Sequence, residues 1–303
     1  MAFARRPRAT WRLRSRTFEL GKYTLVMGVL NVTPDSFSDG GTFFGTNVAT
    51  ARALAMLDEG AAIVDIGGES TRPDAQPVSA QEEMDRVLPV IEAVLRERPE
   101  CVISVDTYKM ETARAAVAAG AEIVNDVSGL VWDPAMVRAC TDLRCGVVLM
   151  HTRGRPSQWK TQPRPDPEDV LPIVRDALKH RLQHAVAAGV ERERVILDPG
   201  FGFGKMAEDN YPLLARLDEL LELGQPLMVG LSRKSFLGIT ITRGAAPPPV
   251  LNRGNATLAA TTAAILAGAS VVRVHDVRPA LEAARIADAI LAAPDATADM
   301  WGR

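Results

Sequence analysis

The sequence predicts an α/β protein whose main part is a (β/α)8 TIM barrel with a short N-terminal hairpin extension. Three observations support this fold class: eight short runs rich in Val, Ile, Leu or Met recur along the chain, helix-like segments separate them, and no change in composition marks a second domain. Strands that alternate with helices form βαβ units and hence parallel sheets that are buried on both faces. Eight such units favour a closed barrel over an open sheet.

The predicted strands are short and occur at regular intervals. They span residues 24–30, 62–66, 101–105, 122–124, 146–150, 194–197, 227–229 and 270–274. Between them, segments 49–59 and 170–188 are amphipathic, and the second follows Pro-Asp-Pro-Glu-Asp, which is typical of a helix start. Gly60, Gly120 and Gly268 each stand just before the next strand, where left-handed helix caps are expected.

The only long uncharged run, residues 254–272, is dominated by Ala, Thr and Gly. Such a run is weak transmembrane material, so it predicts a buried helix that ends near Gly268 and a strand directly after it. No membrane partner is therefore expected.

The length and charge of the chain fit one domain with small-molecule substrates. The 303 residues are 47% hydrophobic and 24% charged, and the net charge of -2 gives no reason to expect a nucleic acid partner. We place the barrel at residues 21–295 and a basic extension at residues 1–20. Within the extension, segments 11–13 and 18–20 predict a small hairpin that closes the N-terminal mouth of the barrel.

The cysteines and the first residues predict a cytoplasmic protein. Cys101, Cys140 and Cys145 are too few for a disulfide framework and lack the C-x-x-C spacing of zinc sites. The first sixteen residues carry six arginines and no acidic residue. No apolar stretch follows them, so a secretory signal is not expected, and an Arg-rich transit peptide is the alternative interpretation.

Polar side chains follow every predicted strand. In a barrel the loops after the strands build the active site, so these side chains should meet on one face. A single Asp or Asn at such a place is more often a cap or turn residue, and Asp126 and His151 have this structural role as their alternative. The polar groups are Asn31, residues 67–72, Asp106, Asn125, Asp126, His151, Asp198, residues 232–234, Arg273 and His275.

Two of these groups predict an anion site. Arg273 and His275 alternate along one strand and should point to the same side, and residues 232–234 add cations from the neighbouring strand. Barrels often bind phosphate at this corner, and a solvated charge pair is the alternative. Asn31 offers an amide oxygen to Mg2+, which keeps several waters and shares the phosphates of a substrate.

The segment Asp198-Pro-Gly-Phe-Gly-Phe-Gly-Lys205 matches neither the Walker loop nor the G-x-G-x-x-G fingerprint. Its glycines are expected to let the backbone approach a flat ligand. Phe201 or Phe203 could supply an apolar wall, with core packing as the alternative for either. Carboxylates such as Asp106 and Asp198 accept two parallel N–H donors, which a 2-amino-4-oxo-pyrimidine ring presents.

Taken together, these motifs resemble those of the dihydropteroate synthases from about Met27 to Val277. The resembling segments are MGVLNVTPDSFSDGG (27–41), DIGGESTRP (65–73), SVDTYK (104–109), NDVSG (125–129), MH (150–151), DPGFGFGK (198–205), GLSRKSFLG (230–238) and RVHDV (273–277). The resemblance implies a transferase of folate biosynthesis. Such an enzyme condenses 6-hydroxymethyl-7,8-dihydropterin pyrophosphate with p-aminobenzoate and releases pyrophosphate.

The resemblance also implies roles for individual residues. Pterin-binding residues would be Asp106, Asn125, Met150, Asp198, Lys234 and Arg273. Pyrophosphate-binding residues would be Asn31, Thr71, Arg72, Arg273 and His275, with Mg2+ as the cofactor on Asn31. Residues at p-aminobenzoate would be Phe37, Thr71, Pro73, Phe203, Lys234 and Ser235. The catalytic set would be Lys234, Arg273, His275 and Asp106. Sulfonamides are expected as inhibitors and a homodimer as the assembly.

One position departs from the family pattern, and two other functions remain to be weighed. Asp74 stands where the family has glycine, which puts the detailed p-aminobenzoate geometry in question. A related barrel that transfers a methyl group from a reduced folate would share Asp106 and Asn125 but would not need Arg72. A non-catalytic pterin-binding paralogue should have lost Lys234 or Thr71, and both are present.

Overall fold

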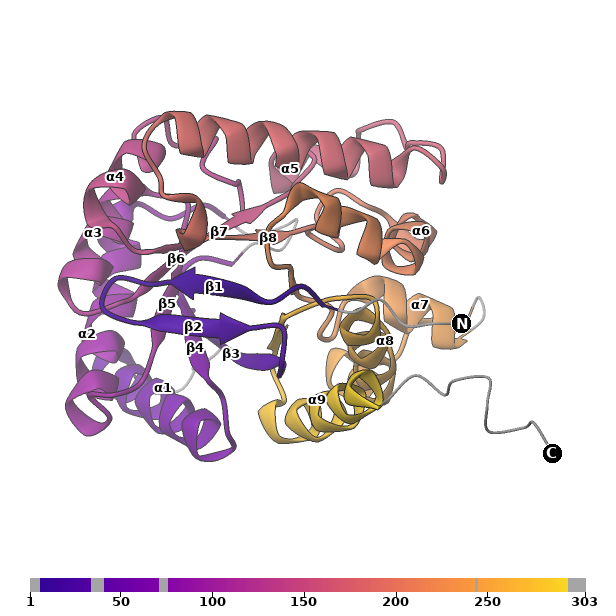
Figure 1. Ribbon diagram of the computed structural model, residues 1–303. Helices are drawn as coiled ribbons and strands as arrows, with labels where there is room; N and C mark the ends of the chain where they lie inside the picture. Colours follow the sequence, from indigo (N-terminus) through magenta and orange to yellow (C-terminus); the bar gives the residue numbers. More distant parts are fainter. Residues whose placement is uncertain (1–5, 34–40, 71–75, 243–244, 294–303) are drawn as a thin grey trace.

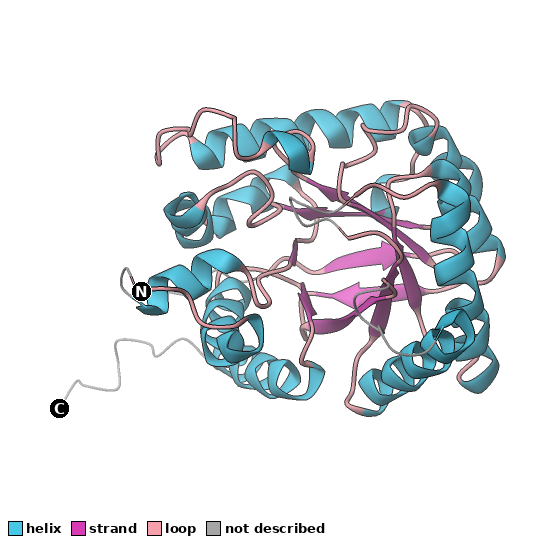
Figure 2. Ribbon diagram, turned by 180° about the vertical axis from the view of Figure 1, so that it is seen from behind, coloured by secondary structure: helices cyan, strands magenta, loops and turns pink. Residues whose placement is uncertain are grey.

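The computed structural model describes residues 6–33, 41–70, 76–242 and 245–293, which form an eight-stranded parallel barrel surrounded by helices (Figures 1 and 2). The strand order is β8-β7-β6-β5-β4-β3-β10-β9. A parallel bridge between Leu197 and Leu227 joins β8 to β9 and closes the barrel. The strands are β3 (Leu25–Asn31), β4 (Ile63–Gly67), β5 (Ile103–Asp106), β6 (Ile123–Asp126), β7 (Gly146–Met150), β8 (Val195–Asp198), β9 (Met228–Val229) and β10 (Val271–Val274).

All eight predicted strands are confirmed, and several end one or two residues later than the apolar runs. Asn31, Asp106, Asp126 and Asp198 are therefore the last residues of their strands and not the first residues of loops. The fold class predicted from the sequence is confirmed.

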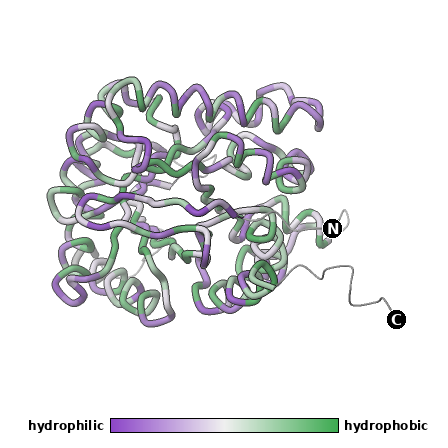
Figure 3. Tube along the Cα trace, viewed as in Figure 1, coloured by the Kyte–Doolittle hydropathy of each residue, from purple (hydrophilic) through white to green (hydrophobic). Residues whose placement is uncertain are grey.

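The helices form the outer layer. They are α1 (Gly41–Asp58), α2 (Ala80–Glu97), α3 (Met110–Ala118), α4 (Met136–Leu143), α5 (Val170–Ala187), α6 (Asn210–Ala215), α7 (Ser235–Thr242), α8 (Gly254–Leu266) and α9 (Val277–Ala292). Hydrophobic residues run along the strands and recur along each helix in Figure 3, because one face of each helix packs on the barrel. Gly60, Gly120 and Gly268 have φ of 102°, 113° and 108°, which confirms the predicted left-handed caps.

The uncharged run at 254–272 forms α8 and then β10, as the sequence predicts. Thr257, Ala260 and Ala264 of α8 are buried, and small side chains allow this close packing. Across the described ranges no helix is both long and apolar enough to cross a membrane.

The predicted hairpin is also confirmed, and it closes the N-terminal end of the barrel. Strands β1 (Ala9–Arg12) and β2 (Thr17–Leu20) pair antiparallel, with Trp11 opposite Phe18. Trp11 is fully buried among inward-facing strand residues, including Met27 and Ile123, and its indole N–H donates to the carbonyl of Arg194 at 2.9 Å. The hairpin is thus part of the core inside the barrel.

The arginines near the start of the chain hold this extension to the barrel. Arg6 bonds Asp288 of α9 and donates to the hydroxyl of Thr24 at 2.7 Å. Arg12 pairs with Glu191 at 2.5 Å. We therefore assign these arginines to packing of the extension, a role that their sequence alone did not reveal.

Replacing Trp11 with phenylalanine is expected to lower the free energy of unfolding by about 1–3 kcal/mol, because the buried carbonyl of Arg194 loses its donor. Urea denaturation of both proteins measures this difference. Tyr23→Phe, at a side chain that is 61% exposed, serves as the control. Equal midpoints for Trp11→Phe and the control would show that the bond does not stabilise the fold.

Candidate active site

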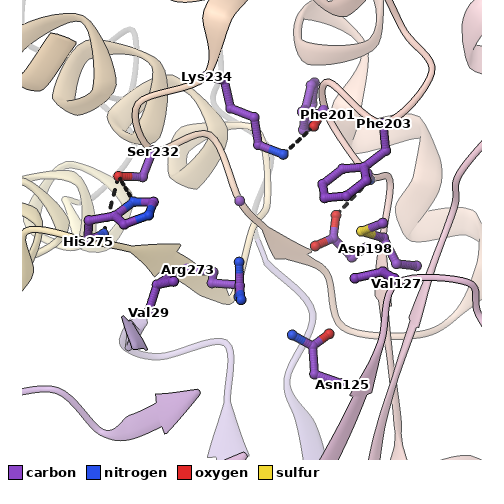
Figure 4. A pocket seen from close by; sticks show the side chains of 13 residues that line it. Val29, Asn125, Val127, Asp198, Phe201, Phe203, Ser232, Lys234, Arg273 and His275 are labelled. Atoms are coloured by element: carbon purple, nitrogen blue, oxygen red, sulfur yellow. Dashed lines mark hydrogen bonds between the residues drawn. The ribbon is translucent and has the colours of Figure 1, made fainter. Parts of the chain in front are cut away.

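A pocket of about 450 Å³, open to solvent, lies at the carboxyl ends of the strands (Figure 4). This is the end of a barrel where active sites form. Five of the six residues predicted to bind pterin line it, together with His275 and Phe203. The lining residues are Val29, Asn125, Val127, Met150, Asp198, Gly200, Phe201, Phe203, Gly230, Ser232, Lys234, Arg273 and His275.

Arg273 is at the centre of an ion cluster on one side of the pocket. Its Nε donates to Asp65 Oδ2 and its Nη2 to Asp106 Oδ2, each at 2.6 Å. Asp65 lies on β4, is fully buried, and also accepts a bond from Asn125 Nδ2 at 3.0 Å. The guanidinium is therefore fixed in the pocket wall with part of its donor capacity already used.

Asp65 is the functional residue that sequence reasoning did not single out. It stands inside the apolar run 62–66, and a lone carboxylate between Val64 and Ile66 was the only available signal. A charge buried in a strand needs a partner, so its position pointed to a cation from elsewhere in the barrel. The structure identifies this cation as Arg273.

Asp106 is the sixth predicted pterin residue, and it is not among the residues that line the pocket, although it bonds Arg273, which is one of them. Burial raises the pKa of its carboxyl to about 7, although the positive charge of Arg273 opposes this shift. The negative charge of Asp65 acts in the same direction as burial. Arg273 occupies one oxygen of Asp106, and the other accepts no hydrogen bond from the described residues.

Lys234 follows β9 and points across the pocket. Its Nζ donates to the carbonyl of Phe201 at 2.6 Å and lies 3.9 Å from the ring centroid of Phe203. Burial lowers the pKa of this amine to about 7, while the carboxylate of Asp198 favours its charged form. Asp198 accepts a bond from the backbone N–H of Gly200 at 2.7 Å, and burial raises the pKa of this carboxyl.

The glycine-rich segment after β8 forms the wall beneath Lys234. Gly200 adopts φ of 65°, and a Cβ at this residue would lie 1.9 Å from the carbonyl oxygen of His151. The close approach of the His151 carbonyl therefore already requires glycine at this position. Phe201 is fully buried core, whereas Phe203 packs edge-on against Trp159 and borders the pocket.

Arg273 and His275 line the same pocket, as the alternation along their strand predicts. The charge state of His275 follows from its surroundings. Burial, followed by the positive charge of Arg273, lowers the pKa of His275 to about 3, so its ring is neutral near pH 7. Arg233 also does not face the pocket, because it forms a two-point ion pair with Asp276 at 2.6 and 3.2 Å.

Asp126 and His151 are structural, which was their alternative interpretation. The carboxylate of Asp126 accepts bonds from the backbone N–H groups of Ser128 and Leu130 at 2.7 and 3.1 Å. His151 is buried, and its Nδ1 lies 2.9 Å from Nζ of Lys205. Neither side chain lines the pocket.

The remaining predicted residues lie around the pocket or outside the described ranges. Asn31 is exposed at the end of β3, and Ser235 is exposed at the first residue of α7. Phe37, Thr71, Arg72, Pro73 and Asp74 are outside the described residues. Within the described ranges, no three His, Cys, Asp or Glu side chains are grouped as for a metal ion.

Comparison with known proteins points to the same chemistry. The family model described as "Pterin binding enzyme" matches residues 27–275. A dihydropteroate synthase from Synechocystis is 44% identical over 273 residues, covering 90% of this chain and 92% of its own.

Two solved structures are similar over nearly the whole chain. Dihydropteroate synthase from Xanthomonas albilineans with 4-aminobenzoic acid has a TM-score of 0.86 and 42% identity, covering 95% of this chain and 100% of that one. The Yersinia pestis dihydropteroate synthase in a sulfonamide drug complex has a TM-score of 0.83 and 41% identity, covering 93% and 98%.

Proposed function

The chain belongs to the pterin-binding enzyme family and, within it, to the dihydropteroate synthases, and on this premise we propose roles for individual residues of the pocket. The enzyme is a transferase of folate biosynthesis. It condenses 6-hydroxymethyl-7,8-dihydropterin pyrophosphate with p-aminobenzoate to give 7,8-dihydropteroate and pyrophosphate. The observation that carries the assignment of roles is that Asn125, Asp198, Lys234 and Arg273 face one pocket.

The pterin would bind between these polar groups, with Met150 against one face of its ring. Asp106 and Asp198 each keep one carboxylate oxygen that no described residue uses, so each can accept N–H groups of the heterocycle. Asn125 donates one amide hydrogen to Asp65, which leaves its amide oxygen to accept from the ligand. Lys234 would donate to an acceptor on the ring.

The pyrophosphate would lie at Arg273 and His275, with Asn31, Thr71 and Arg72 completing its site. Mg2+ is the proposed cofactor. Asn31 is exposed at the end of β3, and its side chain has no hydrogen-bond partner among the described residues, so its amide oxygen fits a magnesium ion that keeps its waters. When bound, Mg2+ would neutralise charge on the departing pyrophosphate.

The reaction then needs no strong base. Arg273 would stabilise the negative charge that develops as the bond between the pterin methylene and pyrophosphate breaks. The pterin ring spreads the positive charge left on the methylene carbon, and the neutral amine of p-aminobenzoate attacks this carbon and then loses one proton to solvent or to the departing pyrophosphate. The pocket walls would exclude water, which competes as a nucleophile.

The p-aminobenzoate would bind beside the pterin against Phe203, Lys234 and Ser235, with Phe37, Thr71 and Pro73 completing its site. Lys234 lies over the ring of Phe203, so one amine can border both substrates. Sulfonamides would inhibit by occupying this site; the similar Yersinia pestis enzyme has been solved in a sulfonamide drug complex.

A cytoplasmic homodimer is the proposed assembly. Large apolar side chains are exposed on neighbouring elements near the end of the chain: Ile241 of α7 is 50% exposed, Leu251 between α7 and α8 is 72%, and Ile286 of α9 is 64%. An apolar surface of this kind is typical of a subunit interface.

The test of the reaction is pyrophosphate release by the purified protein. Release should require the pterin pyrophosphate and p-aminobenzoate together, and it should fall sharply after Mg2+ is removed with EDTA and return when Mg2+ is added back. A folded protein that binds pterin but releases no pyrophosphate would support the non-catalytic paralogue. Methyl transfer from a reduced folate would support the rival barrel.

The value of kcat/KM for the pterin substrate is expected to fall as the pH drops through about 7. This parameter reports the groups of the free enzyme, and the raised pKa of Asp106 means that its accepting carboxylate is lost in this range. Asp106→Asn should have lower activity without this acidic limb. The same limb in both enzymes would assign it to the substrate or to another residue.

A further inference from the structure

Ser232 and His275 form a close pair at the anion corner of the pocket (Figure 4). The hydroxyl oxygen of Ser232 lies 3.0 Å from Nδ1 of the His275 ring. The same oxygen accepts the backbone N–H of His275 at 3.2 Å. Ser232 is 7% exposed as a residue, so most of it is buried although it lines the pocket.

The position of the protons in this pair follows from the available partners. The serine hydroxyl has one hydrogen to donate, and no acceptor other than Nδ1 is found for it among the described residues. If Nδ1 carried the ring proton, both N–H groups of His275 would point at the serine oxygen and the buried hydroxyl hydrogen would be left without an acceptor. Buried donors are rarely left unpaired. The hydroxyl therefore donates to Nδ1.

We propose that Ser232 is a positioning residue that holds His275 in the tautomer with its proton on Nε2, so that a neutral N–H donor faces the leaving pyrophosphate. The tautomer follows from the contacts of Ser232 alone, whereas the identity of the anion rests on the proposed function. The other tautomer would present the lone pair of Nε2 to the pocket and would repel an anion.

The surroundings of His275 favour this arrangement. Its neighbours include the cations of Arg273, Arg233 and Lys234, which oppose a positive charge on the ring, and the nearby carboxylate of Asp276 is paired with Arg233. That ion pair also ties the segment after β9 to the segment after β10. Arg52 of α1 donates to the backbone carbonyl of His275 at 3.0 Å. Arg52 thus fixes the backbone at His275, while Ser232 contacts the ring itself and sets its protonation pattern.

The first test is the ¹⁵N spectrum of the histidine rings in the ligand-free protein at pH 7. The spectrum distinguishes a protonated ring nitrogen from an unprotonated one, and the His275→Gln variant assigns the signal. We expect a protonated Nε2 and an unprotonated Nδ1 in the native protein, and a mixture of tautomers in Ser232→Ala. A protonated Nδ1 in the native protein would overturn the proposal whether or not the enzyme makes dihydropteroate.

The second test compares binding of the pterin alcohol with binding of its pyrophosphate ester by calorimetry. Ser232→Ala should weaken binding of the ester about 10-fold, the size of one hydrogen bond, and leave binding of the alcohol unchanged. Ser232→Thr, which keeps the hydroxyl, should bind the ester as tightly as the native protein does. Equal weakening of both ligands would indicate general damage and count against a positioning role.

A matched pair of variants at His275 covers the case in which Ser232→Ala does not fold. The amide nitrogen of glutamine reaches the place of Nε2, whereas that of asparagine reaches only the place of Nδ1. His275→Gln should therefore retain more affinity for the pyrophosphate ester than His275→Asn. The reverse order would contradict a donor at Nε2.

Discussion

Replacing Lys234 with methionine is expected to lower kcat/KM about 100-fold to 1,000-fold, the usual loss when one donor at a reacting centre is removed. Methionine keeps the length and the apolar stem over Phe203 but cannot donate to the pterin or to the carbonyl of Phe201. Steady-state pyrophosphate release measures the loss. Lys179→Met, at an exposed position on α5, is the matched control and should retain activity.

Lys234→Met should remain as stable as the native protein. Burial lowers the pKa of Lys234, which shows that the folded protein disfavours the charged amine, and an apolar side chain removes this penalty. The carbonyl of Phe201 also loses its donor, which offsets this gain, so thermal unfolding near pH 7 should give a midpoint close to that of the native protein. Retained turnover, or an activity loss that follows from unfolding, would remove Lys234 from the proposed reaction.

Asp65→Asn is the second change with a large expected effect, at about a 100-fold loss of kcat/KM. Asp65 holds Arg273 and Asn125 through one oxygen, so its substitution releases two side chains that face the substrate. Displacement of binding groups by about 1 Å can lower the reaction rate by this factor even when the reacting groups themselves are unchanged. Product formation and pterin binding should both be measured, because we expect slower product formation and weaker pterin binding.

The matched control for Asp65→Asn is Ser104→Ala. Ser104 pairs with Asp65 in the adjacent strand β5 and is equally buried, but its hydroxyl has no hydrogen-bond partner in the described part of the chain. We expect nearly native activity from it. If both variants lose the same activity, the barrel interior is sensitive to any change and Asp65 has no special role.

The barrel and the convergence of its polar side chains could be predicted because both follow from local patterns. Apolar runs mark the strands, and parallel strands bring their carboxyl ends to one edge whatever the details of packing. The sequence therefore placed Asn125, Asp198 and Lys234 in one pocket before any contact was known.

The features that escaped prediction depend on contacts between distant parts of the chain. The role of Asp65 needs Arg273, which is 208 positions away and meets it only in the closed barrel. The neutral state of His275 results from burial and from its cationic neighbours, neither of which can be read from a strand pattern. The turn of Arg233 toward Asp276 likewise follows from tertiary geometry, since a run of cations by itself predicts only a positive surface.

The bond between Arg6 and Asp288 has a consequence for how the chain folds. These residues are 282 positions apart, so their contact can form only after residue 288 has left the ribosome. The contact of Arg6 must therefore wait for α9, and this bond should be among the last to form. The bond also brings the two ends of the described chain together. A circular permutant in which a short linker joins these ends and new ends are made in an exposed loop should therefore still fold.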